Sequence, residues 1–431
     1  MKRLTDILFL TAAFFCCVSC DWFSDEKETK LENVMILYSA GFNSLSDDLV
    51  RDIDDLKEGS LPSRKDKQAV IIVNHCTERY LSYNKPTRPA IIRLYKDSKR
   101  GPILDTLTTL PETSLLTDPE VIADALNFIA EKFKSEKYGL IFSSHGTGWL
   151  PAGYYASPDK YDGTGGGDFF KTQARNRRNG SAVPYAESNM PGPRVKTFGE
   201  EIFYENNVRM SYETSIQDLA KALPFHFDYI IFDACLMGGI EVAYELKDKC
   251  DYLGFSQAEM LADGLEYTKI TTHLLKSGDP DLKGVADDYY ETYEGRYGDY
   301  KSATFSIVKC SEIDNLAGVC KDLFEKYADK IASVDPSEVQ KYFRSYHHWF
   351  YDLEDILAKS GASKQDMEDL HSAIDNCMYY KVCTEYFMPS SGGFQINTFS
   401  GLSMYLPCNG SPYLDAYYKT YGWNRATALV K

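Results

Sequence analysis

The sequence is poor in positive charge. Its 431 residues carry 47 lysines and arginines against 63 aspartates and glutamates, which gives a formal net charge of −16 and a pI near 5.0. Nucleic-acid binding depends on clustered lysine and arginine side chains that neutralise phosphates. The composition therefore argues against a nucleic-acid partner, and a solvated acidic surface is the simplest interpretation.

Several catalytic signatures are missing as well. The chain has no G-x-S-x-G turn, which a serine hydrolase of the α/β type would need. His347, His348 and His371 lie in stretches expected to be helical, with no C-x-x-C pair nearby, so a zinc enzyme is not expected. The glycine-rich residues 163–167 are too irregular for a dinucleotide-binding loop, which would need a preceding strand.

A disulfide framework is not expected either, although the chain has 11 cysteines. Cys16, Cys17 and Cys20 belong to the N-terminal signal, and Cys235 is a candidate reactive residue after a predicted strand. The remaining seven are irregularly spaced in a chain too long to need covalent staples. Buried free thiols are the expectation for most of Cys76, Cys250, Cys310, Cys320, Cys377, Cys383 and Cys408.

The first residues predict export. Lys2 and Arg3 precede an apolar run at residues 7–15 that is too short to span a bilayer comfortably. The sequence C-V-S-C at residues 17–20 resembles a bacterial lipobox, in which Cys20 would be acylated and become the new N-terminus. Residues 21–32 would then form a polar tether. We expect a lipoprotein at the outer membrane or cell surface, with a plain cleaved signal peptide as the alternative.

Strand and helix signals alternate over residues 33–275. Apolar or β-branched runs predict strands at 33–40, 68–74, 90–95, 138–144, 229–232 and 252–256. Amphipathic runs predict helices at about 44–57, 119–134 and 213–223. Ser44 or Ser46 would cap the first helix, and Asp118 would cap the second.

This alternation predicts an α/β fold with a mostly parallel sheet covered by helices on both faces. Residues 276–431 are predicted to be a mainly helical C-terminal region. Its expected helices lie at 282–293, 312–332, 338–357 and 364–377, with strands at 303–308 and 402–406.

Two of the predicted strands end on reactive side chains. The run 229–232 is closely followed by Cys235, and the run 138–144 leads directly into His145. Open α/β folds place their chemistry at the carboxyl edge of the sheet. If the two strands are neighbours, the thiol and the imidazole meet there as a nucleophile and its base.

A long insert, residues 151–209, separates these two strand ends. Its middle is rich in Gly, Ser, Asn and Arg and shows almost no apolar periodicity. A loop of this length inside a compact domain is usually functional or disordered. Its basic residues include Lys171, Arg175, Arg177, Arg178 and Arg194.

The two strand ends also carry a family resemblance. The motifs S-S-H-G at 143–146 and F-D-A-C-L-M at 232–237 resemble the clostripain family of cysteine peptidases, in the clan of caspases, gingipains, legumain and separase. The similarity covers about residues 33–275, with a weaker echo at 401–407. It implies a caspase-like fold and hydrolysis of peptide bonds after Arg or Lys.

The resemblance also implies residue roles. His145 would be the general base and then the general acid, and Cys235 would be the nucleophile that forms a thioester. The backbone N–H groups of Cys235 and Gly146 would bind the oxyanion. Asp233 and Asp263 would bind the basic side chain of the substrate. The loop after Asp263 departs from the family pattern, because Leu265 stands where a Trp is common.

Members of this family are often made as inactive single chains that cut themselves between the His and the Cys. Here the expected sites are Lys171, Arg175, Arg177, Arg178 and Arg194, and a permanently open, unprocessed loop is the alternative. No cofactor is expected to be required. Some members use calcium, but the sequence assigns no metal ligands. A catalytically silent surface binding module of the same fold is the alternative to an enzyme, although the presence of both His145 and Cys235 argues against it.

Overall fold

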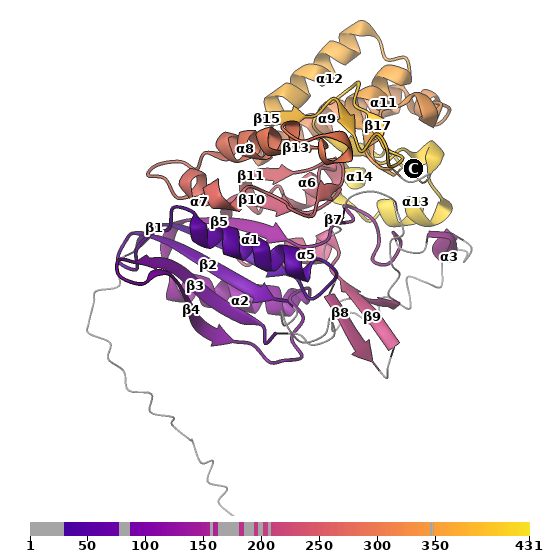
Figure 1. The fold of residues 1–431 in the computed structure, drawn as a ribbon. Helices are drawn as coiled ribbons and strands as arrows, with labels where there is room; N and C mark the ends of the chain where they lie inside the picture. The colour runs from indigo at the N-terminus through magenta and orange to yellow at the C-terminus, as the bar shows by residue number, and fades with distance from the viewer. Residues whose placement is uncertain are drawn as a thin grey trace, which may run out of the picture.

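The computed structural model describes residues 30–76, 87–155, 158–162, 181–184, 194–196, 201–205, 208–344, 347 and 349–431. A nine-stranded sheet runs through its centre in the order β15-β13-β11-β10-β5-β1-β2-β3-β4 (Figure 1). The five middle strands are mutually parallel: β11 (Cys250–Phe255), β10 (Phe227–Asp233), β5 (Ser135–Ser143), β1 (Leu31–Ala40) and β2 (Gln68–His75). Both edges are antiparallel, with β3 (Ala90–Asp97) and β4 (Gly101–Thr109) on one side and β13 (Thr304–Lys309) and β15 (Met378–Cys383) on the other.

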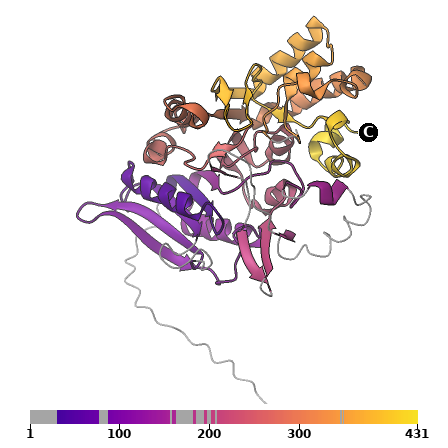
Figure 2. The ribbon, with the colours of Figure 1, turned by 45° about the vertical axis from the view of Figure 1, so that its right-hand side comes forward.

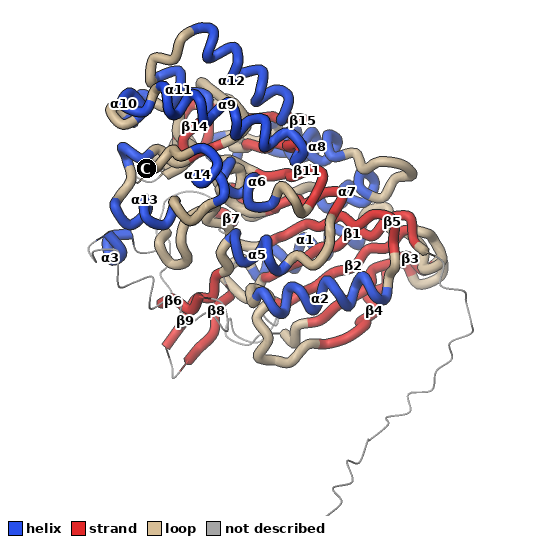
Figure 3. The backbone as a smooth tube through the Cα atoms, turned by 180° about the vertical axis from the view of Figure 1, so that it is seen from behind, coloured by secondary structure: helices blue, strands red, loops and turns tan. Residues whose placement is uncertain are grey.

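Helices cover both faces of this sheet. One face carries α1 (Ser46–Glu58), α7 (Tyr267–Leu274) and α8 (Leu282–Glu294), which pack side by side. The other face, turned toward the viewer in Figure 3, carries α2 (Pro119–Lys132), α5 (Ile216–Ala222) and α6 (Ile240–Leu246). The predicted fold class, an α/β fold with a mostly parallel core sheet, is confirmed.

Apolar strand residues form the core between these layers. The middle strands are buried over consecutive residues, as in residues 34–37 of β1 and 230–232 of β10. Consecutive burial is what a strand covered on both faces requires, and it explains why these strands could be recognised as continuous apolar runs. Edge strand β4 alternates half-buried and exposed positions and was not predicted.

N-terminal caps were predicted for two helices, and the structure confirms one of them and contradicts the other. Asp118 accepts a hydrogen bond from the N–H of Glu120 at the start of α2, as predicted. Helix α1 begins after Leu45 without a side-chain cap, so the predicted cap by Ser44 or Ser46 is wrong. Ser44 instead directs its hydroxyl to His145, a contact across 101 positions that local sequence cannot reveal.

The C-terminal region contributes two sheet strands, β13 and β15, as well as helices, and the predicted domain division near residue 275 stays a prediction. Besides α8, its α-helices are α9 (Ile313–Lys326), α10 (Ala328–Ile331), α11 (Leu353–Lys359), α12 (Lys364–Cys377), α13 (Pro412–Tyr418) and α14 (Gly422–Thr427).

The helix predicted at 338–357 is wrong over most of its length. Trp349, Phe350 and Tyr351 are all buried, and Tyr351 lies in β14 (Tyr351–Asp352), which pairs with β18 (Ser403–Met404). Consecutive burial of large aromatic rings suits an extended chain between packed layers and not one face of a helix.

Within the parts of the chain that the structure describes, none of the helices combines the length and apolar character that a membrane span needs.

The insert has more regular structure than predicted. Its described elements are α3 (Pro158–Asp162), β6 (Ser181–Pro184), β7 (Val195–Lys196), β8 (Glu201–Glu205) and β9 (Val208–Glu213). Strands β6, β9 and β8 form a small antiparallel sheet. Figure 2 shows β8 and β9 projecting from the body of the molecule.

Candidate active site

The two reactive strand ends lie next to each other. Strands β5 and β10 are parallel neighbours, and Ser143 is in register with Asp233. Because His145 and Cys235 each follow two positions later, both leave the sheet at the same level of its carboxyl edge. The predicted adjacency of the two strands is confirmed. Their catalytic roles stay predictions at this point.

Cys235 is held by the loop that follows β11. Its sulfur accepts a hydrogen bond from the N–H of Met260 at 3.1 Å and donates to the Met260 carbonyl at 3.6 Å. Met260 begins the short strand β12 (Met260–Leu261). The next residue, Leu236, adopts a φ of 60°, which is costly for a branched side chain and is found mainly where function requires it. The turn after β10 therefore has a strained backbone at the candidate nucleophile.

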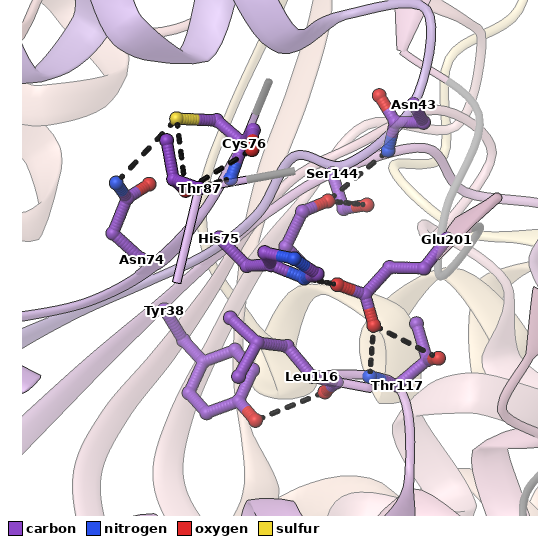
Figure 4. Close-up of polar contacts among 11 residues, drawn as sticks. Tyr38, Asn43, Asn74, His75, Cys76, Thr87, Leu116, Thr117, Ser144 and Glu201 are labelled. Atoms are coloured by element: carbon purple, nitrogen blue, oxygen red, sulfur yellow. Dashed lines mark hydrogen bonds and ion pairs between the residues drawn. The ribbon is translucent and has the colours of Figure 1, made fainter. Parts of the chain in front are cut away.

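His145 is anchored to the loop after β1. Its Nε2 lies 2.9 Å from Oγ of Ser44. The preceding Ser144 donates its hydroxyl to the Ala40 carbonyl at 2.7 Å, a contact drawn beside Asn43 in Figure 4. The loop after β1 therefore positions the imidazole, a role of Ser44 that adjacent residues in the sequence do not reveal.

Gly148 brings the loop after His145 close to the loop after Cys235. Its φ is 58°, and a Cβ at this position would lie 2.4 Å from the Leu236 carbonyl oxygen. Such an approach is open only to glycine. Gly146 lies in the same loop, directly after His145, and its predicted oxyanion role together with the N–H of Cys235 stays a prediction.

Asp233 lies beneath the candidate dyad and is fully buried. Its Oδ2 accepts hydrogen bonds from Oγ of Ser143 at 3.0 Å and from the Tyr267 hydroxyl at 2.7 Å. Burial, followed by the charge of Asp233, raises the pKa of Tyr267 well above its ordinary value. Tyr267 therefore stays a protonated donor that holds the Asp233 carboxylate in place.

Asp263 lies nearer the surface, with its side chain 47% exposed. Its Oδ2 lies 2.7 Å from Nη1 of Arg296, and its Oδ1 lies 3.4 Å from Nη1 of Arg51. The Tyr293 hydroxyl donates to the Gly264 carbonyl at 2.8 Å and senses the charge of both acids. Its pKa is raised first by burial and then by nearby charges that include Asp233 and Asp263. The two predicted substrate acids thus share one neighbourhood but differ strongly in burial.

The remaining predicted site residues are mostly outside the described residues, namely Cys20, Lys171, Arg175, Arg177 and Arg178. Arg194 is described, and it contacts Asp48 of α1 and the Ser44 carbonyl.

Among the residues that the structure describes, no group of three or more His, Cys, Asp or Glu side chains is arranged to hold a metal ion. Calcium dependence stays an open prediction.

Solved structures of the same fold are cysteine proteases. An inactive zymogen C11 protease from Parabacteroides distasonis matches with a TM-score of 0.70 and 24% identity, over 93% of this chain and 99% of that chain. A secreted C11 cysteine protease from Bacteroides thetaiotaomicron matches with a TM-score of 0.69 and 25% identity, over 93% of this chain and 100% of that chain. In fold, this chain is therefore similar to cysteine proteases of the C11 class.

The sequence comparisons give the family directly. The model of the clostripain family matches residues 37–176 and 204–427. Clostripain from Hathewaya histolytica is 24% identical over 453 residues, which cover 92% of this chain and 78% of that protein. The chain belongs to the clostripain family of cysteine proteases, and the predicted family resemblance is confirmed.

Proposed function

We propose that this protease is an exported endopeptidase that cleaves after Arg or Lys, with Cys235 as its nucleophile and His145 as its base. The observation that carries the proposal is the register of β5 and β10, which brings both residues to one level of the carboxyl edge, with Asp233 buried beside them. This is the edge at which open α/β folds perform chemistry.

The proposed reaction follows from these positions. His145 takes the thiol proton, and the Cys235 thiolate attacks the carbonyl carbon of the scissile bond. The backbone N–H that Met260 donates to the sulfur stabilises the negative thiolate. The N–H groups of Gly146 and Cys235 bind the tetrahedral oxyanion, and losing one such donor typically costs about 10²–10³ in rate.

The tetrahedral intermediate then collapses and breaks the carbon–nitrogen bond. The leaving amine takes its proton from His145, and the acyl group remains on Cys235 as a thioester. Water, deprotonated by His145, attacks the thioester and releases the carboxylate product together with the free thiol. The reaction requires no third member of a triad.

Specificity for a basic side chain rests on the two acids. A desolvated carboxylate binds a guanidinium through two parallel hydrogen bonds, and Asp233 is the desolvated member of the pair. Asp263 already contacts Arg51 and Arg296, so it would act mainly through its charge. A substrate with an acidic residue at this position would face two like charges.

Export and activation by self-cleavage are further parts of the proposal. The Bacteroides thetaiotaomicron relative is described as secreted and the Parabacteroides distasonis relative as an inactive zymogen, which supports both. Cys235 is fully buried and His145 only 6% exposed, as expected of a closed, uncut chain. Cleavage within the insert would open the site, while acylated Cys20 would anchor the protein to a membrane.

Fluorogenic peptides ending in Arg, Lys, Asp or Asn test the activity. The protein should hydrolyse only the first two, and Cys235→Ala and His145→Ala should each abolish turnover. Cys408→Ala is the matched control, because it removes an exposed thiol elsewhere. Iodoacetamide should label Cys235 in a pH-dependent way. No turnover and no privileged thiol would favour the silent binding module.

A further inference from the structure

One strand of the insert, β7, lies against β12, the short strand whose Met260 contacts the Cys235 sulfur. Strand β7 pairs antiparallel with β12, with Val195 opposite Leu261. The pairing continues one residue further, because the N–H of Ala262 donates to the Arg194 carbonyl at 2.9 Å. Since the N–H of Met260 in β12 donates to the Cys235 sulfur, β12 contacts both the insert and the candidate nucleophile.

The side chain of Arg194 docks beside His145. Its Nη2 lies 3.1 Å from Oδ2 of Asp48, whose side chain is only 5% exposed, and it also donates to the Ser44 carbonyl. Oγ of Ser44 lies 2.9 Å from the imidazole. A largely buried carboxylate and a backbone carbonyl thus form a receptor for one guanidinium at the candidate active site.

Each half of this contact is weak by itself. A ladder of two or three paired residues has little stability alone in water. An arginine that is exposed on one side and paired with one carboxylate typically contributes only a modest free energy to stability. Together they are the two parts of peptide recognition at a sheet edge, in which main-chain bonds supply affinity and a side-chain pocket supplies specificity.

The following part of the insert has its own anchor. Glu201 is fully buried, and its carboxylate contacts Nδ1 of His75 at 2.5 Å and the N–H of Thr117 at 3.0 Å (Figure 4). His75 ends β2, so this anchor joins the insert to the central sheet. Residues 194–196 can therefore leave β12 while Glu201 stays in place.

We propose that the edge of β12, Asp48 and the Ser44 carbonyl form a binding site for an extended peptide strand that carries an arginine, and that Arg194 occupies this site in the uncut chain. The site uses Asp48, which Arg51 joins to Asp263 through contacts of 3.5 and 3.4 Å, and it adds a second requirement for basic residues next to the proposed substrate acids. The consequence of this site for catalysis rests on the proposed function, because a substrate strand can bind there only after residues 194–196 have left. Arg194 is then a docking residue and not a cleavage site.

Hydrogen–deuterium exchange in the Cys235→Ala protein tests the internal contact without any peptidase activity. Arg194→Ala and Asp48→Asn should each accelerate exchange at Ala262 about two- to fivefold, the size expected for loss of one partly exposed ion pair. Lys57→Ala is the matched control, because it removes another cation of α1, one that pairs with Asp54 at 2.5 Å, and leaves Asp48 and the insert untouched. It should leave the exchange unchanged.

A synthetic peptide of residues 192–198 tests the site in trans. Added to the Arg194→Ala, Cys235→Ala protein, it should slow the exchange at Ala262 again. The same peptide with alanine in place of arginine should not, and Asp48→Asn should remove the effect. The proposal would be overturned if Arg194→Ala or Asp48→Asn left the exchange rate at Ala262 equal to that of the parent protein. It would also be overturned if the arginine and alanine peptides slowed this exchange equally. Because the readout needs no turnover, this result is independent of whether the proposed cleavage after Arg or Lys is correct.

Discussion

Replacing Asp233 with asparagine should cost far more activity toward an arginine substrate than the same replacement at Asp263. Asparagine keeps the shape of the side chain and an oxygen that can accept from Ser143 and Tyr267. Only the charge is lost. The two variants therefore compare one chemical change at a fully buried position and at a side chain that is 47% exposed.

Burial sets the two magnitudes. Removing one partner of a desolvated charge pair costs about 2–5 kcal/mol, which corresponds to roughly 30-fold to several thousand-fold in kcat/KM. An exposed charge contributes about 0.2–1 kcal/mol, or fivefold at most. Asp263 also has Arg51 and Arg296 as partners, which screen it further. We expect Asp233→Asn to lose at least about sixfold more activity than Asp263→Asn.

Paired fluorogenic peptides ending in arginine or in citrulline measure this difference. Citrulline has nearly the same shape without the positive charge, so the ratio of the two kcat/KM values isolates the charge interaction. The rate of Cys235 alkylation by iodoacetamide controls for damage to the nucleophile. A larger loss in Asp263→Asn than in Asp233→Asn would refute the argument from burial. An equal loss on both peptides in Asp233→Asn would show a structural role only.

Three further predictions concern processing and stability. Purified wild type should separate into two chains on a denaturing gel and Cys235→Ala should stay whole; a single-chain wild type with full activity would contradict self-activation. Burial raises the pKa of Glu241 from its usual 4.5 to about 7, so the stability it contributes is present below pH 4.5 and is lost as the pH rises toward 7. Glu241→Gln should remove this decline in urea unfolding, and an unchanged decline would contradict the assignment. Arg344 and Glu259 form an ion pair at 2.6 Å with side chains 2% and 0% exposed, so Arg344→Ala should destabilise the fold by about 3–5 kcal/mol. Adding Glu259→Gln should restore part of that loss, and no restoration would show that lost packing dominates.

Much of the central sheet was predictable from local pattern. Strands β1, β2, β5, β10 and β11 contain continuous apolar runs, because parallel strands covered on both faces are buried over consecutive positions. The cap of α2 by Asp118 was predictable because the residues that form it are neighbours in the chain. Cys235 and His145 were recognisable because each ends such a run.

Contacts between distant segments were not predictable. The sequence marks Ser44 as a possible helix cap and places Asp48 inside the helix predicted at about 44–57, and both expectations use only adjacent residues. Their contacts with His145 and Arg194 span 101 and 146 positions, and exist only because β1, β5 and the insert meet at one edge of the sheet. The same holds for the burial that distinguishes Asp233 from Asp263. Local sequence determines which segments become strands and helices, whereas packing of those segments decides which polar side chains lose water and which partners they find.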